Sequence, residues 1–204
     1  MLTLAAAVGA GVGAAAAKPI KLIAFGDSLT AGYGVAPGQA FPDVLEKALR
    51  ARGYDVKVIN AGVSGETTGD GLARFDWSVP PDTGALIVEL GANDMLRGLP
   101  VENARRSLSA ILQKATAAHI PTLLAGMVAA PNLGPDYRAS FDRIFPDLAA
   151  QYGVALYPFF LDGVAADPKL NQPDGLHPAP EGVKVIVQRM LPAVMTLLDR
   201  AKSG

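Results

Sequence analysis

The chain has 204 residues, of which 50% are hydrophobic and 18% are charged. This length can bury one substantial core, and the composition is typical of a globular protein rather than a disordered one. Lys and Arg total 18 and Asp and Glu total 19, which gives a formal net charge of −1. A basic surface for nucleic acid or for an anionic membrane is therefore not expected. The absence of cysteine excludes disulfides, thiolate metal sites and a cysteine nucleophile.

The N-terminal segment, residues 2–17, is almost wholly Ala, Val, Gly and Leu, and the first charge is Lys18. An apolar stretch that ends in small residues is typical of a secretory signal, and Ala15–Ala17 suits its cleavage region. Residues 1–17 are therefore interpreted as a signal remnant, and the protein as periplasmic or secreted. Because the basic start of a signal is missing, an apolar N-terminal helix that stays attached is the alternative. The segment is too short and too rich in Gly for stable membrane insertion.

Residues 18–204 are expected to form a single domain in which short apolar runs alternate with amphipathic segments. The apolar runs predict five strands, at Ile20–Phe25, Val56–Ile59, Ala85–Leu90, Thr122–Met127 and Val154–Tyr157. The amphipathic segments predict helices: one after Pro42 that Gly53 ends, then Val101–Ala115, Asp136–Tyr152 and Glu181–Asp199, the last kinked at Pro192. The stretch Asn60–Gly71 is dense in Gly, Ser and Thr and is expected to begin, at least, as a loop.

Strands that are nearly continuous apolar runs, separated by helices, predict an α/β fold with a parallel sheet covered on both faces. Ligands of such sheets bind at the carboxyl ends of the strands. Three loops that leave strands at this edge are the richest in Gly and polar residues, so the candidate site lies there.

The first of these loops is Gly26-Asp27-Ser28-Leu29, directly after the first predicted strand. A serine hydroxyl at a strand-to-helix turn is exposed at the edge of the sheet. Its own N–H lies at a helix N-terminus, where an anion is favoured. Taken alone, the pattern is equally typical of an ordinary N-cap, and Asp27 is expected to cap the helix that follows Ser28.

The second signal is Asp174-Gly175-Leu176-His177-Pro178. Three residues apart on a turn, Asp174 can meet one imidazole nitrogen of His177 while the other faces away, as in a catalytic triad. An Asx-turn beside a surface histidine is the plain alternative, and two ligands are too few for zinc. The other histidine, His119, precedes Pro121 and is expected at a helix end, without a catalytic part.

Two further loops offer donors for an oxyanion. Asn60–Thr67 contains Gly62 and Gly65, whose backbones a ligand can approach closely, and Gly91–Asp94 contains the Asn93 side-chain amide. Either loop alone is ordinary turn chemistry. The Asp94 carboxylate is expected to tie its own loop through backbone hydrogen bonds.

Together, Gly26–Leu29, Ser64–Thr67, Gly91–Asp94 and Asp174–Pro178 resemble the four blocks of the GDSL/SGNH hydrolase family, in the family's order. The resemblance spans about Lys21–Leu198 and is closest to small periplasmic esterases with thioesterase, arylesterase and lysophospholipase activity. One departure is Ala92, where that branch often has a second Gly and where a methyl group could narrow the approach.

The resemblance implies a three-layer α/β/α flavodoxin-like fold with a five-stranded parallel sheet. It implies Ser28 as nucleophile, His177 as general base and Asp174 as its orienting carboxylate. It also implies an oxyanion hole made by the N–H groups of Ser28 and Gly65 and the side chain of Asn93. No cofactor or metal is implied, and the protein is expected to be a monomer or homodimer.

The expected activity is hydrolysis of small-molecule carboxylic esters, aryl or short-to-medium acyl, with thioesters and lysophospholipids as further candidates. A carbohydrate O-deacetylase of the same family and a catalytically silent binding protein are the alternatives. An acyl pocket is expected between the loops Met127–Tyr137 and Pro158–Pro173. Residues just beyond the motif loops are interpreted as its lining, with plain core as an equal alternative: Tyr33, Met95, Leu96 and Leu99.

Overall fold

The computed structural model of the chain describes residues 18–203. Five parallel strands form one sheet in the order β2-β1-β3-β4-β5. Their bounds are β1 (Ile20–Gly26), β2 (Val56–Gly62), β3 (Ala85–Glu89), β4 (Thr122–Ala125) and β5 (Ala155–Tyr157). The predicted five-stranded parallel sheet is confirmed, whereas the interpretation of residues 1–17 lies outside the described residues.

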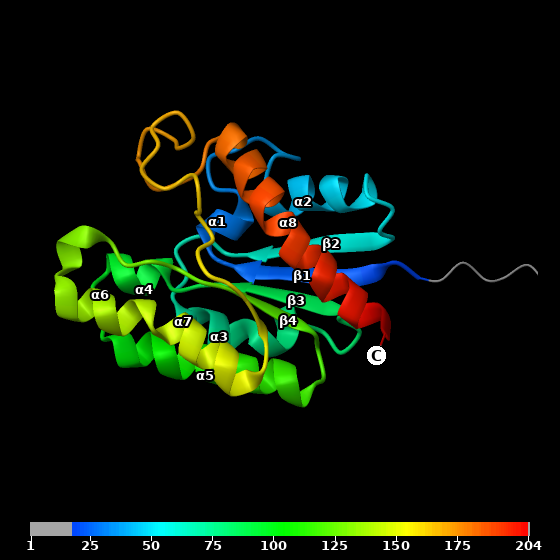
Figure 1. Cartoon of the computed structure of the whole chain (residues 1–204), viewed down its shortest axis with the longest axis horizontal. Coiled ribbons are helices and arrows are strands. Elements are labelled where there is room, and N and C mark those ends of the chain that lie inside the picture. Colours follow the sequence, from blue (N-terminus) through cyan, green and yellow to red (C-terminus); the bar gives the residue numbers. More distant parts are fainter. Residues whose placement is uncertain (1–17, 204) are drawn as a thin grey trace, which may run out of the picture.

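Helices cover both faces of this sheet. They are α1 (Ser28–Ala31), α2 (Phe41–Arg50), α3 (Thr68–Ser78), α4 (Ala92–Leu96), α5 (Val101–Ala117), α6 (Pro135–Asp142), α7 (Ile144–Tyr152) and α8 (Pro180–Ser203), with a 3-10 turn at Pro131–Leu133. Figure 1 shows α2 and α8 together on one face and α3, α5 and α7 on the other, in agreement with the contacts between these elements. The result is the three-layer α/β/α arrangement that the resemblance implies.

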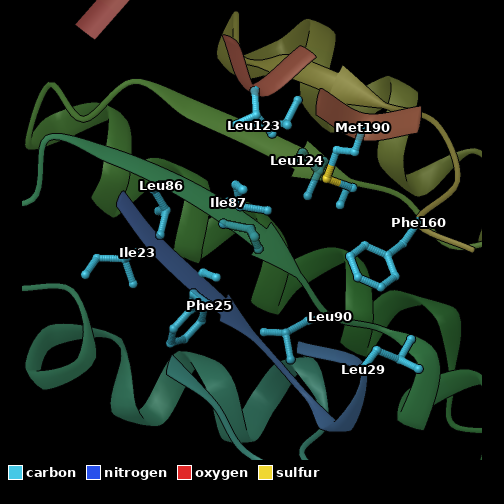
Figure 2. Close-up of a cluster of buried hydrophobic side chains, with 14 of the residues drawn as sticks. Ile23, Phe25, Leu29, Leu86, Ile87, Leu90, Leu123, Leu124, Phe160 and Met190 are labelled. Carbon is cyan, nitrogen blue, oxygen red and sulfur yellow. The ribbon is translucent and has the colours of Figure 1, made fainter. Parts of the chain in front are cut away.

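The apolar strands form the centre of the core. The β1 burial pattern is complete from Leu22 to Gly26, and every residue of β3 and β4 is buried. Figure 2 shows ten of the core side chains by name, from Ile23 and Phe25 of β1 to Met190 of α8. Helices thus cover both faces of the central strands, and a site can form at the carboxyl ends of the strands.

The expectation of a loop from Asn60 is wrong for its first three residues, because β2 continues to Gly62 in register with Gly26 of β1. A Cβ on Gly62 would lie 2.3 Å from the Ala31 backbone nitrogen. Glycine thus allows this extension beside α1. The true loop is short, since Thr67 and Asp70 form a capping box that starts α3.

The single amphipathic segment expected over Asp136–Tyr152 is divided into α6 and α7 at Arg143. Pro146 has no N–H with which to bond the Asp142 carbonyl, and this accounts for the break. Helix α2 ends at Arg50, and Gly53 lies in the following turn with φ +83°. In α8, Pro192 lies inside the helix; the kink there stays a prediction. Within residues 18–203, no helix combines the length and the apolar character needed to cross a membrane.

Candidate active site

Ser28 stands at the first position of α1, directly after β1. The Asp27 side chain accepts a hydrogen bond from the N–H of Leu29 at 3.0 Å, so the expected N-cap is confirmed. Gly32, in the left-handed region, ends the helix after one turn. Because the cap and the short helix fix the turn, the Ser28 hydroxyl is held at the carboxyl edge of the sheet.

The His177 ring connects Ser28 with Asp174. Its Nε2 lies 2.9 Å from Ser28 Oγ, and its Nδ1 lies 2.7 Å from Asp174 Oδ2. The other carboxylate oxygen of Asp174 accepts the N–H groups of Leu176, at 2.9 Å, and of His177, at 3.0 Å. Three side chains from opposite ends of the chain thus form one hydrogen-bonded row in the order carboxylate, imidazole, hydroxyl.

The Asp174 carboxylate is stabilised in its charged form. The N–H groups of His177 and Leu176, followed by the His177 side chain, lower its pKa to about 2. An ionised Asp174 favours a proton on Nδ1 of His177 and leaves the lone pair of Nε2 facing Ser28. In this tautomer, the imidazole can accept the hydroxyl proton.

Gln172 holds the loop that carries His177. Its side-chain amide donates to the carbonyls of Tyr33, at 2.7 Å, and Pro178, at 3.0 Å, and its N–H donates to the His177 carbonyl at 2.7 Å. The Tyr33 ring lies against the imidazole, with centroids 4.6 Å apart. The sequence interpretation missed Gln172, since a lone glutamine in a polar loop carries no distinguishing pattern.

The three expected oxyanion donors differ in whether their N–H groups already have hydrogen-bond acceptors. Among the described residues, no acceptor binds the N–H of Ser28 or of Gly65, and Gly65 has φ +85°. The Asn93 amide donates to Asp27 Oδ2 at 3.0 Å and to the Glu66 carbonyl at 2.9 Å. Both of its hydrogens have acceptors, so to bind an oxyanion the amide must share one of them.

The expectation for Asp94 is wrong. Its carboxylate accepts from the N–H and the hydroxyl of Thr68, at 2.8 and 2.7 Å, and so joins α4 to the start of α3 rather than tying its own loop. Because these oxygens are satisfied in a buried place, the loop that carries Asn93 is fixed to α3.

A pair of buried carboxyl groups lies beneath the Ser28 turn. Asp27 and Glu89 are both fully buried, and Glu89 Oε2 accepts from the Thr30 hydroxyl at 2.7 Å while its Oε1 has no partner among the described residues. Burial raises the pKa of Asp27 to about 6. Burial and the neighbouring Asp27 charge raise the pKa of Glu89 well above its usual value. Burial thus favours the neutral, protonated form of Glu89. The sequence interpretation missed it, although an acidic residue that closes an apolar strand was a usable signal.

A cavity of about 520 Å³ opens beside Ser28 and His177. Its lining is largely apolar and comes from the two loops expected to shape it, through Met127–Pro131 and through Phe159 and Leu161. Met95 and Leu96 line it as expected, and so does Ala92. Tyr33 and Leu99 do not: Tyr33 packs on His177 instead, and Leu99 lies at a different surface hollow.

Most of the chain matches a known protein family. Residues 24–185 match the model of the GDSL-like lipase/acylhydrolase family. The chain belongs to this family. It is a carboxylic ester hydrolase of the SGNH type, so the family, fold and enzyme class expected from the sequence are confirmed.

The relatives are esterases of similar length. The chain is 39% identical to the esterase TesA of Pseudomonas aeruginosa over 178 residues, 87% of this chain and 89% of the relative. It is 41% identical to an arylesterase of Vibrio mimicus over 162 residues, 79% of this chain and 81% of the relative. The crystal structure of AlinE4, an SGNH-hydrolase family esterase, covers 90% of this chain and 99% of its own, with 46% identity and a TM-score of 0.76.

Proposed function

We propose that this esterase acts through an acyl-enzyme on Ser28, with His177 as general base and Asp174 as the carboxylate that orients it. The observation that carries the proposal is the 2.9 Å contact between His177 Nε2 and Ser28 Oγ, because proton transfer needs hydrogen-bond reach. The N–H groups of Ser28 and Gly65 and the side chain of Asn93 are proposed as oxyanion donors.

The reaction follows from these roles. Ser28 Oγ attacks the ester carbonyl carbon while its proton passes to His177 Nε2, and the oxyanion is bound by the three donors. The leaving alcohol takes the proton from Nε2, which leaves Ser28 acylated. Water then attacks the acyl carbon, gives its proton to Nε2, and Ser28 is regenerated as the carboxylic acid departs.

The cavity supports esters of aryl or short-to-medium acyl groups as substrates. At about 520 Å³ it lies within the range of small-molecule sites, and its apolar wall favours methylenes or an aromatic ring over sugar hydroxyls. Thioesters are further candidates, since the same attack on a thioester carbonyl expels a thiol.

Hydrolysis of p-nitrophenyl esters from acetate to palmitate, with wild type beside Ser28→Ala, tests the proposal. We expect turnover that the substitution abolishes, together with loss of labelling by a phosphonofluoridate. Wild-type activity that survives in Ser28→Ala would overturn the role of Ser28. Release of acetate from O-acetylated sugars, without turnover of any p-nitrophenyl ester, would identify a carbohydrate deacetylase instead.

We also propose that the enzyme acts in the periplasm or outside the cell, since residues 1–17 have the apolar and small-residue composition of an export signal. Mass spectrometry of the protein from its native host tests this. We expect the mature chain to begin near Lys18, and an intact chain that begins at Met1 would contradict export by cleavage.

A further inference from the structure

One arginine interrupts the apolar wall of the pocket. Arg138 of α6 lines the same cavity as Ser28, beside Ala130 and Pro131. His177 apart, every other side chain in that lining is uncharged. A permanent charge is an unusual component of a surface that otherwise suits methylene groups, because its desolvation is costly unless a counter-charge is supplied.

The described part of the chain supplies no counter-charge to Arg138. No side-chain hydrogen bond or ion pair to it occurs within residues 18–203, and its Nε is buried without an acceptor. Other arginines are paired: Arg74 with Glu66 at 2.5 Å, and Arg105 with Asp147 at 2.9 Å. A buried charged donor without an acceptor is unfavourable, so a ligand that brings an acceptor stabilises the site.

The acidic residues around α6 do not fill this role. Asp142, one turn further along the helix, accepts the N–H of Ala129 at 2.7 Å. Asp94 of α4 accepts two hydrogen bonds from Thr68 at the start of α3. Both carboxylates hold loops that form the pocket, and neither forms an ion pair with Arg138.

We propose that Arg138 binds an anionic group on the acyl part of the substrate, so that the preferred esters are those of acids with a second carboxylate. The inference rests on the proposed function and names its substrate class. The planar guanidinium fork matches a carboxylate with two parallel hydrogen bonds. The apolar wall accommodates the methylenes between the two carboxyl carbons, and the second carboxylate supplies the acceptor that the chain lacks.

The test compares p-nitrophenyl monoesters of dicarboxylic acids, from glutarate to sebacate, with simple acyl esters of equal chain length. Wild type is measured beside Arg138→Met, which keeps an unbranched stem without the charge, and Arg138→Lys, which keeps the charge without the fork. Arg143→Met is the matched control, since Arg143 lines a separate surface hollow with Glu102. An ω-amino acyl ester provides the opposite charge.

At the best chain length, we expect Arg138→Met to lower kcat/KM for the carboxylate ester about tenfold or more relative to wild type. Its kcat/KM for the simple ester should change much less, so the ratio of the two kcat/KM values falls, and turnover of the simple ester also shows that the variant folds. Arg138→Lys should retain part of the preference for the carboxylate ester, and Arg143→Met should retain all of it. The kcat/KM for the ω-amino ester should be higher in Arg138→Met than in wild type.

The inference would be overturned if the ratio of kcat/KM for the carboxylate ester to kcat/KM for the simple ester were the same in wild type and Arg138→Met at every chain length. Arg138 would then contribute only its aliphatic stem as a packing surface. The proposed function would survive that result, because simple esters would still be hydrolysed in a Ser28-dependent manner. A wild-type enzyme that hydrolyses none of these esters would overturn the proposed function, and the inference with it.

Discussion

The side-chain amide of Asn93 donates to Asp27 Oδ2 over 3.0 Å, while Asp27 Oδ1 accepts the N–H of Leu29 at 3.0 Å. One buried carboxyl group therefore connects the turn that presents Ser28 to the loop that presents Asn93. Both loops are fixed relative to each other before a substrate arrives. Such preorganisation lets a donor stabilise developing charge without reorganising.

Asn93→Ala should lower kcat by about 10²–10³, with little change in KM, if the amide binds the oxyanion of the transition state. Steady-state hydrolysis of a p-nitrophenyl ester measures both constants. Asn132→Ala, on the exposed turn beside the pocket, is the control and should keep wild-type kcat. Full kcat in Asn93→Ala would show that its hydrogen bonds to Asp27 and Glu66 are purely structural.

Activity should fall as the pH is lowered, because a general base must be neutral to accept the Ser28 proton. The pKa of Asp174 is about 2, so its carboxylate stays charged across pH 4–9. Its titration therefore does not change kcat within this range. The acid side of the kcat profile should therefore report His177 together with Asp27, because burial raises the pKa of the Asp27 carboxyl group to about 6 and this group bonds the Asn93 amide. A flat profile down to pH 5 would contradict base catalysis by His177.

Glu89→Gln should stabilise the protein at alkaline pH. The folded pKa of Glu89 is raised, so its proton is bound more tightly in the folded state than in the unfolded state. That difference favours folding below the usual carboxyl range near pH 4.5 and is lost as the pH rises toward the folded value. A neutral amide of the same shape avoids this loss.

Thermal unfolding of wild type and Glu89→Gln from pH 4 to pH 9 measures the effect. We expect equal melting temperatures near pH 4 and a variant that melts at least about 2 °C higher at pH 8. The exposed substitution Glu102→Gln should show no such trend. Because burial favours the neutral form of Glu89, a neutral amide should retain kcat at pH 7, and a large loss would indicate that its charge is required.

The family blocks and the sheet were predictable because each is encoded locally. Ser28 directly follows an apolar run, and Asp174 and His177 share one turn. Strand ends were less predictable: β2 runs on to Gly62, which pairs with Gly26 of β1 and lies too close to the Ala31 backbone for any side chain. These contacts join segments far apart in the sequence. Local glycine and serine content had favoured a loop there.

What the sequence could not reveal were the partners of single polar side chains. Asp94 accepts hydrogen bonds from Thr68 on α3, and Glu89 at the end of β3 lies near Asp27, which follows the neighbouring strand β1. Arg138, in the middle of α6, lines the pocket beside Ser28 and His177. Each relationship depends on how helices dock on the sheet, and no periodicity along the chain reports such docking.

Gln172→Ala should lower kcat about tenfold while KM changes little. The substitution removes the donors that hold the carbonyls of Tyr33 and Pro178, at 2.7 and 3.0 Å, on either side of His177. Two lost hydrogen bonds of about 0.5–1.5 kcal/mol each would loosen the loop and misplace the imidazole relative to Ser28. Ester hydrolysis and thermal unfolding are measured together, with Gln39→Ala, at an exposed glutamine, as the control. A lower melting temperature with unchanged kcat would mean that the backbone bond between Gln172 and His177 positions the ring unaided, whereas a loss of kcat confined to Gln172→Ala would identify the side chain as a positioning residue.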